Sequence, residues 1–508
     1  MSSTRDIRHG VNILVEFRRL KEGRALTPDA ATRLASEATA AFLEQHAASG
    51  YYLSEAVTLL CELASMDDPV LSRIGVHGLF PLLVEPLGDA FTPAACAVYN
   101  RLFAQVIQHC RKQPAGAALD RQLQRFGLLT ETDLLTRAAR IREPRRFDHE
   151  RARQVKKAFV LSRVTLGADV AVTSVVLAAL KAVFPMAEIV LVANAKTWQL
   201  FAGDPHVQLC TIEYPRGGGL IERLTSWQCA VEVLRREILG LAPAEYVMID
   251  PDSRLTQLGL LPLVADERSY LFFESRSYGA AGLQKLSALT AHWLQQVFGT
   301  TAPLYPYCAP VPSDVAAAKR IVSTLKKRRT APIVSVNLGI GANPAKRLPD
   351  PFEFRLLARL LAEGATIMLD KGADAEEVAR IEALVAALGR ENFQALALDE
   401  RRDVVSSSAE VGGAALVTWQ GGIGRLAALI AESTAYIGYD SAGQHIAAAF
   451  GVPTIDIFTG FTSPRMPQRW SPHGPGSVYV LVLDAAETYH SARLDAIVDE
   501  VVAHVPRG

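Results

Sequence analysis

The sequence predicts two α/β domains, each with a doubly wound parallel sheet, preceded by an all-helical domain. Three observations support this. The first 150 residues have apolar positions at helical spacing and no alternating strand pattern. From Ala158 onward, short apolar runs alternate with amphipathic stretches, as in parallel sheets with crossover helices. The chain of 508 residues is long enough for roughly two to four domains.

Residues 1–150 are predicted to form the helical accessory domain. Thr27, Pro28 and Asp29 form a helix start. Helices are expected in the segments 34–50, 51–66, 68–87, 91–113 and 119–141. No repeat of about 34 residues is present, so a tetratricopeptide array is not predicted. The basic segment 137–157 is expected to be a solvated hinge, and the alternative is contact with an anionic acceptor or a membrane surface.

The first α/β domain is assigned to residues 151–312 and the second to 313–485. Strands are expected at 159–163, 188–193, 207–212, 245–250 and 269–273 in the first, and at 332–338, 366–370, 393–398, 434–439 and 454–458 in the second. The amphipathic helix within 486–508 is expected to cross back to the first α/β domain. Ligands of such sheets bind beyond the carboxyl ends of the strands.

Composition excludes several classes of function. Lys and Arg number 53, as do Asp and Glu, so no net charge favours nucleic acid. The six cysteines are scattered without a zinc or redox spacing and are expected to be reduced thiols. The polar N-terminus lacks a signal sequence, and no apolar run is expected to span a membrane. We therefore expect a cytoplasmic protein with no metal and no cofactor.

The segment 436–460 is the most informative part of the chain. An apolar run ends at Asp440, a turn of small residues follows, and a helix begins near Gln444 and His445. A helix N-terminus offers free N–H groups and a positive dipole, so this arrangement predicts a phosphate site. The alternative is an ordinary crossover in which Asp440 caps the helix.

This segment resembles the D-[ST]-G-x-x-H-[IL]-A-A-A-x-G-x-P motif of the ADP-heptose:lipopolysaccharide heptosyltransferases, which are GT-B glycosyltransferases. Asp440 and His445 keep the separation of the motif, whereas Gly443 stands one place late and Ala442 occupies the usual glycine position. The resemblance extends over residues 158–465 and implies a GT-B fold, an inverting and metal-independent reaction, and an ADP-heptose donor. The extra helical domain marks a divergent member.

The loop after the first predicted strand resembles the L-G-D-V loop that carries the proposed base of the family. Here it reads Leu166-Gly167-Ala168-Asp169-Val170, with one extra residue. The resemblance assigns the general base to Asp169, and Gly167 permits the tight turn. The alternative is that Asp169 caps a helix.

The segment 338–350 resembles the P-G-A and K-R-W-P loop of the family, with Leu348 in place of the aromatic residue. Gly341 makes the loop flexible, and Lys346 and Arg347 are predicted to neutralise the departing diphosphate. The alternative is a solvated pair of cations.

The remaining donor-side candidates are assigned by the same resemblance. Asp374 is placed near the nucleotide sugar and Gly422 along the nucleotide, whereas Asp440, Ser441, Ala442, Gly443 and His445 would hold the diphosphate and the sugar. An acidic first turn is also ordinary helix chemistry. A histidine on an alanine-rich helix is also often a core residue.

Asp250, Pro251 and Asp252 form a D-x-D sequence after a predicted strand. In GT-A glycosyltransferases such a sequence holds a metal on the diphosphate, whereas in the resembled family this region lies on the acceptor side. We therefore name Asp250 and Arg254 as acceptor candidates. An Asx-capped turn is the preferred interpretation.

Together these features predict a glycosyltransferase. It would move a heptose-like sugar from a nucleotide-diphospho-sugar to a hydroxyl on a glycan, lipid or protein. Asp169, Lys346 and His445 are its catalytic candidates. The alternatives are a GT-B epimerase and a non-catalytic sugar-nucleotide-binding scaffold. The helical domain is expected to recruit the acceptor or to form a homo-oligomer.

Overall fold

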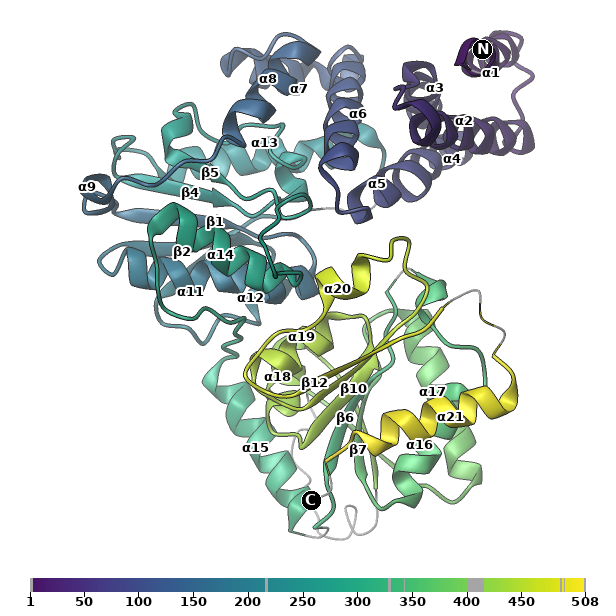
Figure 1. The fold of residues 1–508 in the computed structure, drawn as a ribbon, viewed down its shortest axis with the longest axis vertical. Helices are drawn as coiled ribbons and strands as arrows, with labels where there is room; N and C mark the ends of the chain where they lie inside the picture. Colours follow the sequence, from purple (N-terminus) through teal and green to yellow (C-terminus); the bar gives the residue numbers. More distant parts are fainter. Residues whose placement is uncertain are drawn as a thin grey trace. The chain divides into compact units, whose positions relative to one another are not determined.

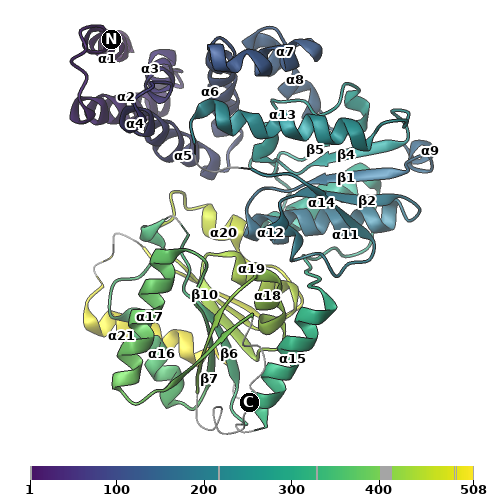
Figure 2. The same ribbon diagram turned by 180° about the vertical axis from the view of Figure 1, so that it is seen from behind.

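A computed structural model describes residues 3–214, 218–327, 330–341, 343–400, 415–484, 487 and 489–506. The chain divides into two compact units, Met1–Arg145 with Ile212–Tyr278, and Arg146–Thr211 with Gly279–Gly508. Figures 1 and 2 show these elements from opposite sides. The boundaries expected at 150, 312 and 485 stay predictions.

The first unit begins with a run of helices, as predicted. They are α1 (Ser3–Glu22), α2 (Pro28–Ser49), α3 (Ser54–Ala64), α4 (Pro69–Leu79), α5 (Glu85–Asp89), α6 (Pro93–Arg111), α7 (Ala117–Arg125) and α8 (Glu131–Ile141). The hydroxyl of Thr27 accepts a hydrogen bond from the Ala30 N–H and caps α2, as its sequence predicts. The same unit contains α13 (Leu220–Glu237), β4 (Tyr246–Asp250) and β5 (Tyr270–Phe272), with short 3₁₀ turns at Pro114–Gly116, Arg254–Thr256 and Glu267–Ser269.

Two predicted helices are interrupted in this unit. The segment 119–141 forms α7 and α8 because Gly127 has a positive φ of 72° and Thr130 then starts α8 with a capping box. The segment 68–87 passes from α4 through a π-helical turn, Phe80–Val84, into α5. Pro81 and Pro86 lack the N–H that a regular helix uses, which explains the irregular turn.

The first sheet is parallel, with strand order β3-β2-β1-β4-β5. Its remaining strands are β1 (Lys157–Leu161), β2 (Glu188–Ala193) and β3 (Val207–Thr211). Its other elements are α9 (His149–Ala152), α10 (Leu166–Ala168), a π-helical turn at Asp169–Thr173, α11 (Ser174–Val183), α12 (Ala195–Trp198) and α14 (Leu286–Phe298). All five strands predicted for this domain are present.

The second sheet is also parallel and has the order β12-β11-β10-β6-β7-β9-β8. Its strands are β6 (Ile333–Asn337), β7 (Thr366–Asp370), β8 (Ala395–Asp399), β9 (Leu416–Gln420), β10 (Ala435–Tyr439), β11 (Thr454–Phe458) and β12 (Val478–Val482). The five predicted strands are present, whereas β9 and β12 were not anticipated. Two parallel α/β sheets after a helical region confirm the predicted fold class.

Helices cover both faces of the second sheet (Figures 1 and 2). They are α15 (Pro312–Lys326), α16 (Phe352–Ala362), α17 (Ala375–Arg390), α18 (Ile423–Ala431), α19 (Ala442–Ala449), α20 (Met466–Trp470) and α21 (Ser491–Ala503), with a 3₁₀ turn at Pro344–Lys346. The helix α21 packs against α16, and its residues Leu494, Ile497 and Val501 belong to the core of the second domain. The prediction that this helix crosses back is therefore wrong, because its apolar face is already buried here.

Two helical stretches, Pro69–Asp89 and Leu166–Val183, are long and apolar enough to cross a membrane by length and composition alone. The sequence expectation had excluded such stretches. Buried core helices pass the same test, and 67% of the apolar window within Leu166–Val183 is buried. The finding is therefore weak evidence for a membrane span.

Replacing Ile497 by alanine is expected to lower the free energy of unfolding by about 2–5 kcal/mol, because it leaves a cavity in a packed core. The Ile497 side chain is 0% exposed. Urea unfolding measures the change. As a control, Asp499→Ala removes only a surface ion pair of 3.4 Å with Arg359 and should cost about 0–1 kcal/mol. Equal effects of the two substitutions would show that α21 is not docked on α16.

Candidate functional site

The candidate site lies in the second unit, where loops follow the carboxyl ends of β6, β7 and β10. The strands β6 and β10 are neighbours, with Gly438 opposite Asn337, so the loops that follow them emerge side by side. The short helix α10, after β1, packs against α19. The loops predicted to act on the donor therefore meet the loop predicted to carry the base.

Lys346 and Asp440 form an ion pair at the N-terminus of α19. The Nζ atom of Lys346 lies 2.5 Å from Oδ2 of Asp440 and 3.3 Å from its backbone oxygen. The amide of Gln444 donates to the other carboxylate oxygen over 2.8 Å. The structure thus brings together the predicted diphosphate cation and the acid that ends β10.

Several buried polar atoms around this ion pair lack a hydrogen bond of normal geometry. They are the hydroxyls of Tyr436 and Ser441, Oε1 of Gln444 and both carboxylate oxygens of Asp456. Burial raises the pKa of Asp456 well above its usual value, and the charge of Asp440 adds to this, whereas Lys346 lowers it. Buried polar atoms are almost always paired, so this group indicates a place for a polar ligand or ordered water.

His445 is a buried, neutral imidazole. Its side chain packs near Trp470, with the ring centroids 6.0 Å apart. Burial lowers the pKa of His445 to about 4, and nearby Lys346 opposes protonation further, whereas Asp440 favours it. A Cβ atom on Gly167 would lie 3.2 Å from Cδ2 of His445, so the missing side chain lets the α10 loop approach α19 closely.

Asp169 is fully buried within the loop after β1. Its carboxylate accepts hydrogen bonds from the hydroxyls of Ser162, Thr173 and Thr197 and from the backbone N–H of Arg163, over 2.7–3.0 Å. The desolvation raises the pKa of Asp169, and these four hydrogen bonds oppose the rise. The contacts are those of a residue that holds the loop together, and the base role implied by the resemblance stays a prediction.

The extra residue in this loop, Ala168, has a visible structural consequence. The helix contains a π-helical turn at Asp169–Thr173, directly after it. A π-turn accommodates one additional residue in a helix. The alternative that Asp169 is a helix cap is not what the structure shows, because its carboxylate accepts from a backbone N–H of the loop after β1 and from three hydroxyls.

Arg347 lies beside Lys346 in sequence but has different partners. Its guanidinium pairs with Asp350 and, over 3.1 Å, with Glu353. Glu353 is buried and also pairs with Arg380 over 2.5 Å. Arg347 is therefore held at the start of α16 by carboxylates, and it is not paired with Asp440 as Lys346 is.

The other donor-side candidates lie at turns and helix starts. Asp374 is exposed and caps α17 by accepting from the Glu376 N–H over 2.9 Å. Gly341 is exposed, with a positive φ of 59°. The N–H of Gly422 donates to Oε1 of Glu400 over 2.8 Å, and a Cβ there would lie 2.6 Å from Oε1 of Gln199. Ala442 and Gly443 form the first turn of α19.

A polar group that the sequence analysis missed lies at the ends of β6 and β7. The amide of Asn337 donates to Asp370 over 2.7 Å, and the Gly372 N–H donates to the same carboxylate. Burial raises the pKa of Asp370 to about 6, and Glu377 raises it further, whereas Lys196 lowers it. Both residues end adjacent parallel strands, and this position could have identified them.

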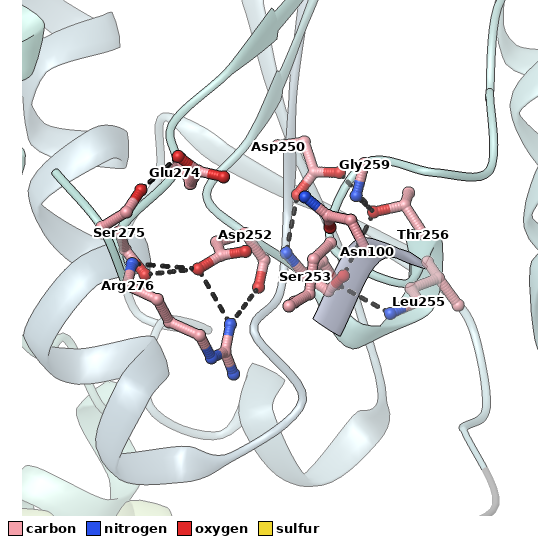
Figure 3. A network of polar contacts seen from close by, with 12 residues as sticks. Asn100, Asp250, Asp252, Ser253, Leu255, Thr256, Gly259, Glu274, Ser275 and Arg276 are labelled. Carbon is pink, nitrogen blue, oxygen red and sulfur yellow. Dashed lines mark hydrogen bonds and ion pairs between the residues drawn. The ribbon is translucent and has the colours of Figure 1, made fainter. Parts of the chain in front are cut away.

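The D-x-D sequence lies in the first unit, and its two carboxylates have separate partners (Figure 3). Asp250 is buried and accepts from the Ser253 N–H and from the hydroxyls of Thr256 and Tyr270. Asp252 pairs with Arg276 over 2.8 Å. This geometry agrees with the preferred interpretation as a turn. No cluster of metal-ligating side chains is found among the described residues.

Asp169→Asn is expected to lower the melting temperature. The amide nitrogen would face hydrogen-bond donors, and an unsatisfied buried group costs about 1–3 kcal/mol. Differential scanning calorimetry measures the shift. Asp374→Asn is the matched control, since asparagine caps a helix as well as aspartate does. An unchanged melting temperature with transfer abolished would instead assign Asp169 as the base.

The buried His445 predicts a specific pH dependence of stability. The unfolded imidazole binds a proton below about pH 6.5, whereas the folded one does so only near 4, so the contribution is present above pH 6.5 and lost on acidification. Between pH 7.5 and 5 this loss amounts to roughly 2 kcal/mol, and His445→Asn should remove it. Urea unfolding at both pH values measures the difference. His77→Asn, on an exposed position of α4, is the control. The idea fails if the wild type and His445→Asn lose equal stability.

A family model described as glycosyltransferase family 9 (heptosyltransferase) matches residues 413–494. These residues include β9, α18, β10, α19 and β11, which carry the motif around Asp440 and His445. The match confirms the predicted resemblance over this segment, and it supports the prediction of a glycosyltransferase. A search of curated proteins gave no match.

Solved structures similar to this chain include a family 9 glycosyl transferase from Veillonella parvula. It is 18% identical, with a TM-score of 0.49, covering 69% of this chain and 96% of that one. The ADP-heptose lipopolysaccharide heptosyltransferase II of E. coli is 19% identical, with a TM-score of 0.44, covering 69% and 98%. The E. coli heptosyltransferase WaaC with ADP is 14% identical, with a TM-score of 0.44, covering 68% and 99%.

Proposed function

We propose that this protein transfers a sugar from a nucleotide-diphospho-sugar to an acceptor hydroxyl. The observation that carries the proposal is the N-terminus of α19, where Lys346 and Asp440 are paired beside buried polar atoms that lack a hydrogen bond of normal geometry. A helix N-terminus with a lysine suits a diphosphate. The family resemblance favours an ADP-sugar with a heptose-like group as the donor.

The proposed reaction breaks one bond and forms one bond at the anomeric carbon. The acceptor oxygen attacks that carbon, the bond to the diphosphate oxygen breaks, and the hydroxyl proton passes to a base. Attack from the face opposite the leaving group inverts the anomeric configuration. The nucleoside diphosphate leaves with the bonding electrons, so negative charge grows on it in the transition state.

Lys346 and the first N–H groups of α19 are placed to stabilise this growing charge. They act from fixed positions in a partly buried site, where electrostatic stabilisation is stronger than in water. The proposal needs no metal, because a cation and a helix dipole supply the positive charge. Asp440 and Gln444 would act as positioning residues that aim the Lys346 ammonium group.

The two acceptor candidates at the end of β4 and in the loop after it differ in their exposure. Asp250 is fully buried, so it can act only by shaping the loop after β4, whereas Arg254 is partly exposed. The acceptor proposed is a hydroxyl on a glycan, lipid or protein. A cytoplasmic location, peripheral membrane contact and a homo-oligomer formed by the helical domain belong to the same proposal.

A thermal-shift screen against ADP-, GDP-, UDP- and CDP-sugars, with and without EDTA, tests the donor assignment. A ligand at a hundred times its dissociation constant stabilises the folded state by about 2.7 kcal/mol. ADP-sugars are expected to raise the melting temperature, and EDTA to leave the shift unchanged. Lys346→Met should abolish most of the shift and lower turnover by about 10²–10³-fold, the size typical of a lost oxyanion donor.

Lys319→Met is the control, because Lys319 is exposed on α15. This variant should bind and turn over like the wild type. Equal behaviour of Lys346→Met and Lys319→Met would remove Lys346 from the site. A shift that EDTA abolishes would contradict the metal-independent reaction, and no shift with any of the four sugar nucleotides would contradict the donor class.

A further inference from the structure

Two arginines of the first unit, Arg223 on α13 and Arg254 after β4, lack an anionic partner. Among the described residues, neither makes an ion pair or a hydrogen bond to a carboxylate. The two elements are in contact, since α13 packs against the 3₁₀ turn Arg254–Thr256. Both arginines are only partly exposed. An arginine usually finds a carboxylate or a phosphate when it is withdrawn from water, so two neighbouring ones without a partner require an explanation.

The surroundings of Arg223 show that it is held in place rather than loosely solvated. Its Cζ atom lies 4.3 Å from the ring centroid of Phe80, a cation–π contact with the π-helical turn of the helical region. Its Nε atom is buried without a hydrogen-bond partner. Burial lowers the pKa of Arg223 and the charge of Arg254 lowers it further, whereas Tyr214 raises it. The positive charge of Arg254 therefore acts unfavourably on the charged form of Arg223.

Two other arginines near this pair already have carboxylate partners. Arg276 pairs with Asp252 over 2.8 Å, as Figure 3 shows, and Arg142 pairs with Glu274. Glu85 is exposed and is the weakest influence on Arg223. Among the described residues, Arg223 and Arg254 therefore keep their positive charges without an ion-pair partner.

Two tyrosines lie near the arginines: Tyr99 is close enough to Arg254, and Tyr214 to Arg223, for their charges to interact. Burial raises the pKa of Tyr99, and Arg254 is the strongest of the charges that lower it. Tyr99 stands on α6 and is stacked on Phe103, with ring centroids 4.6 Å apart, so its position is fixed. A phenol hydroxyl can donate a hydrogen bond to an anionic oxygen.

The loop that carries Arg254 has an unusual backbone. Asp252, Gln257 and Leu258 have positive φ values of 70°, 48° and 56°, although none is glycine. Such a backbone conformation is unfavourable for a residue with a side chain and persists only where the surroundings enforce it. The hydrogen bonds of Asp250 to Ser253 and Thr256 supply that constraint and hold Arg254 in place.

We propose that Arg223 and Arg254, with the hydroxyls of Tyr99 and Tyr214, form a binding site for a dianionic phosphoryl group. Guanidinium forks match the oxygens of a phosphoryl group, and two of them match its charge. Phe80 and Tyr99 come from the helical region, so this region contributes to the site. The assignment of the phosphoryl group to the acceptor substrate rests on the proposed glycosyl transfer, whereas the anion site itself does not.

Isothermal titration calorimetry with inorganic phosphate and with glucose 6-phosphate tests the proposal. The Lys346→Met background removes the competing diphosphate site. Both ligands are expected to bind this background, and the double substitution Arg223→Gln with Arg254→Gln should weaken binding at least tenfold. Phe80→Leu should weaken it about two- to five-fold by removing the cation–π contact. Arg236→Gln is the matched control on α13, because its side chain is 79% exposed.

The controls separate this site from the donor site. Nucleotide-sugar binding by the double variant without Lys346→Met should equal that of the wild type, and circular dichroism should show an intact fold. Tighter binding of glucose 6-phosphate than of phosphate would support a phosphorylated acceptor. Binding of phosphate alone would contradict the acceptor assignment. Equal binding of acetate would contradict the phosphoryl specificity, and no effect of the double substitution would overturn the site.

Discussion

The ion pair between Lys346 and Asp440 is the interaction on which the candidate site depends. It joins the loop after β6 to the end of β10, two segments that are 94 residues apart in the chain. Without Lys346, the unpaired carboxylate of Asp440 would lie at the N-terminus of α19 and repel a diphosphate. Without Asp440, the flexible lysine would lose the group that aims it. The pair therefore neutralises the acid and also fixes the cation where the helix dipole is positive.

The buried polar residues next to this ion pair explain why the site lies at this position. Asp456 stands on β11 opposite Gly438 of β10, in the part of the sheet next to α19. A carboxyl group is costly there unless it is protonated or meets a ligand. Tyr436, Ser441 and Gln444 add buried polar atoms to the same region. Apolar side chains at these positions would make the domain core more stable. The presence of buried polar groups there therefore indicates a functional requirement.

Much of the architecture could be predicted from the sequence because its signals are local. Apolar runs identified the ten predicted strands, and Pro and Gly positions marked the helix ends. The edge strand β12 and the inner strand β9 were missed, because Val478–Val482 is half-exposed and Leu416–Gln420 precedes a glycine pair that resembles a loop. The destination of α21 could not be read from its amphipathic pattern, since such a pattern shows a buried face but not its partner.

Side-chain partners in the candidate site were harder to predict than its location. Lys346 and Arg347 are adjacent, yet one pairs with Asp440 and the other with Asp350 and Glu353, a choice that depends on which way the chain leaves the 3₁₀ turn. Asp169 follows a glycine loop as the motif requires, yet the residue inserted before it directly precedes a π-helical turn. Its carboxylate accepts hydrogen bonds from donors in the β1 loop, in this turn and in α12. A single inserted residue rotates a helix by about 100°. A motif that matches in letters can therefore differ in the direction of its functional side chain.

A second question is why Arg223 and Arg254 have no carboxylate partner among the described residues. Replacing either one by an apolar residue would remove the mutual repulsion, and replacing Arg223 would also remove its buried, unpartnered Nε. The chain instead supports both, with the ring of Phe80 under one and a strained, hydrogen-bonded loop under the other. Both the unpaired guanidinium of Arg223 and the strained loop that carries Arg254 lower stability. Such costs are expected where a bound anion compensates the two positive charges. The helical region is then part of a binding site, because its π-helical turn and α6 contribute the surface on which that anion would rest.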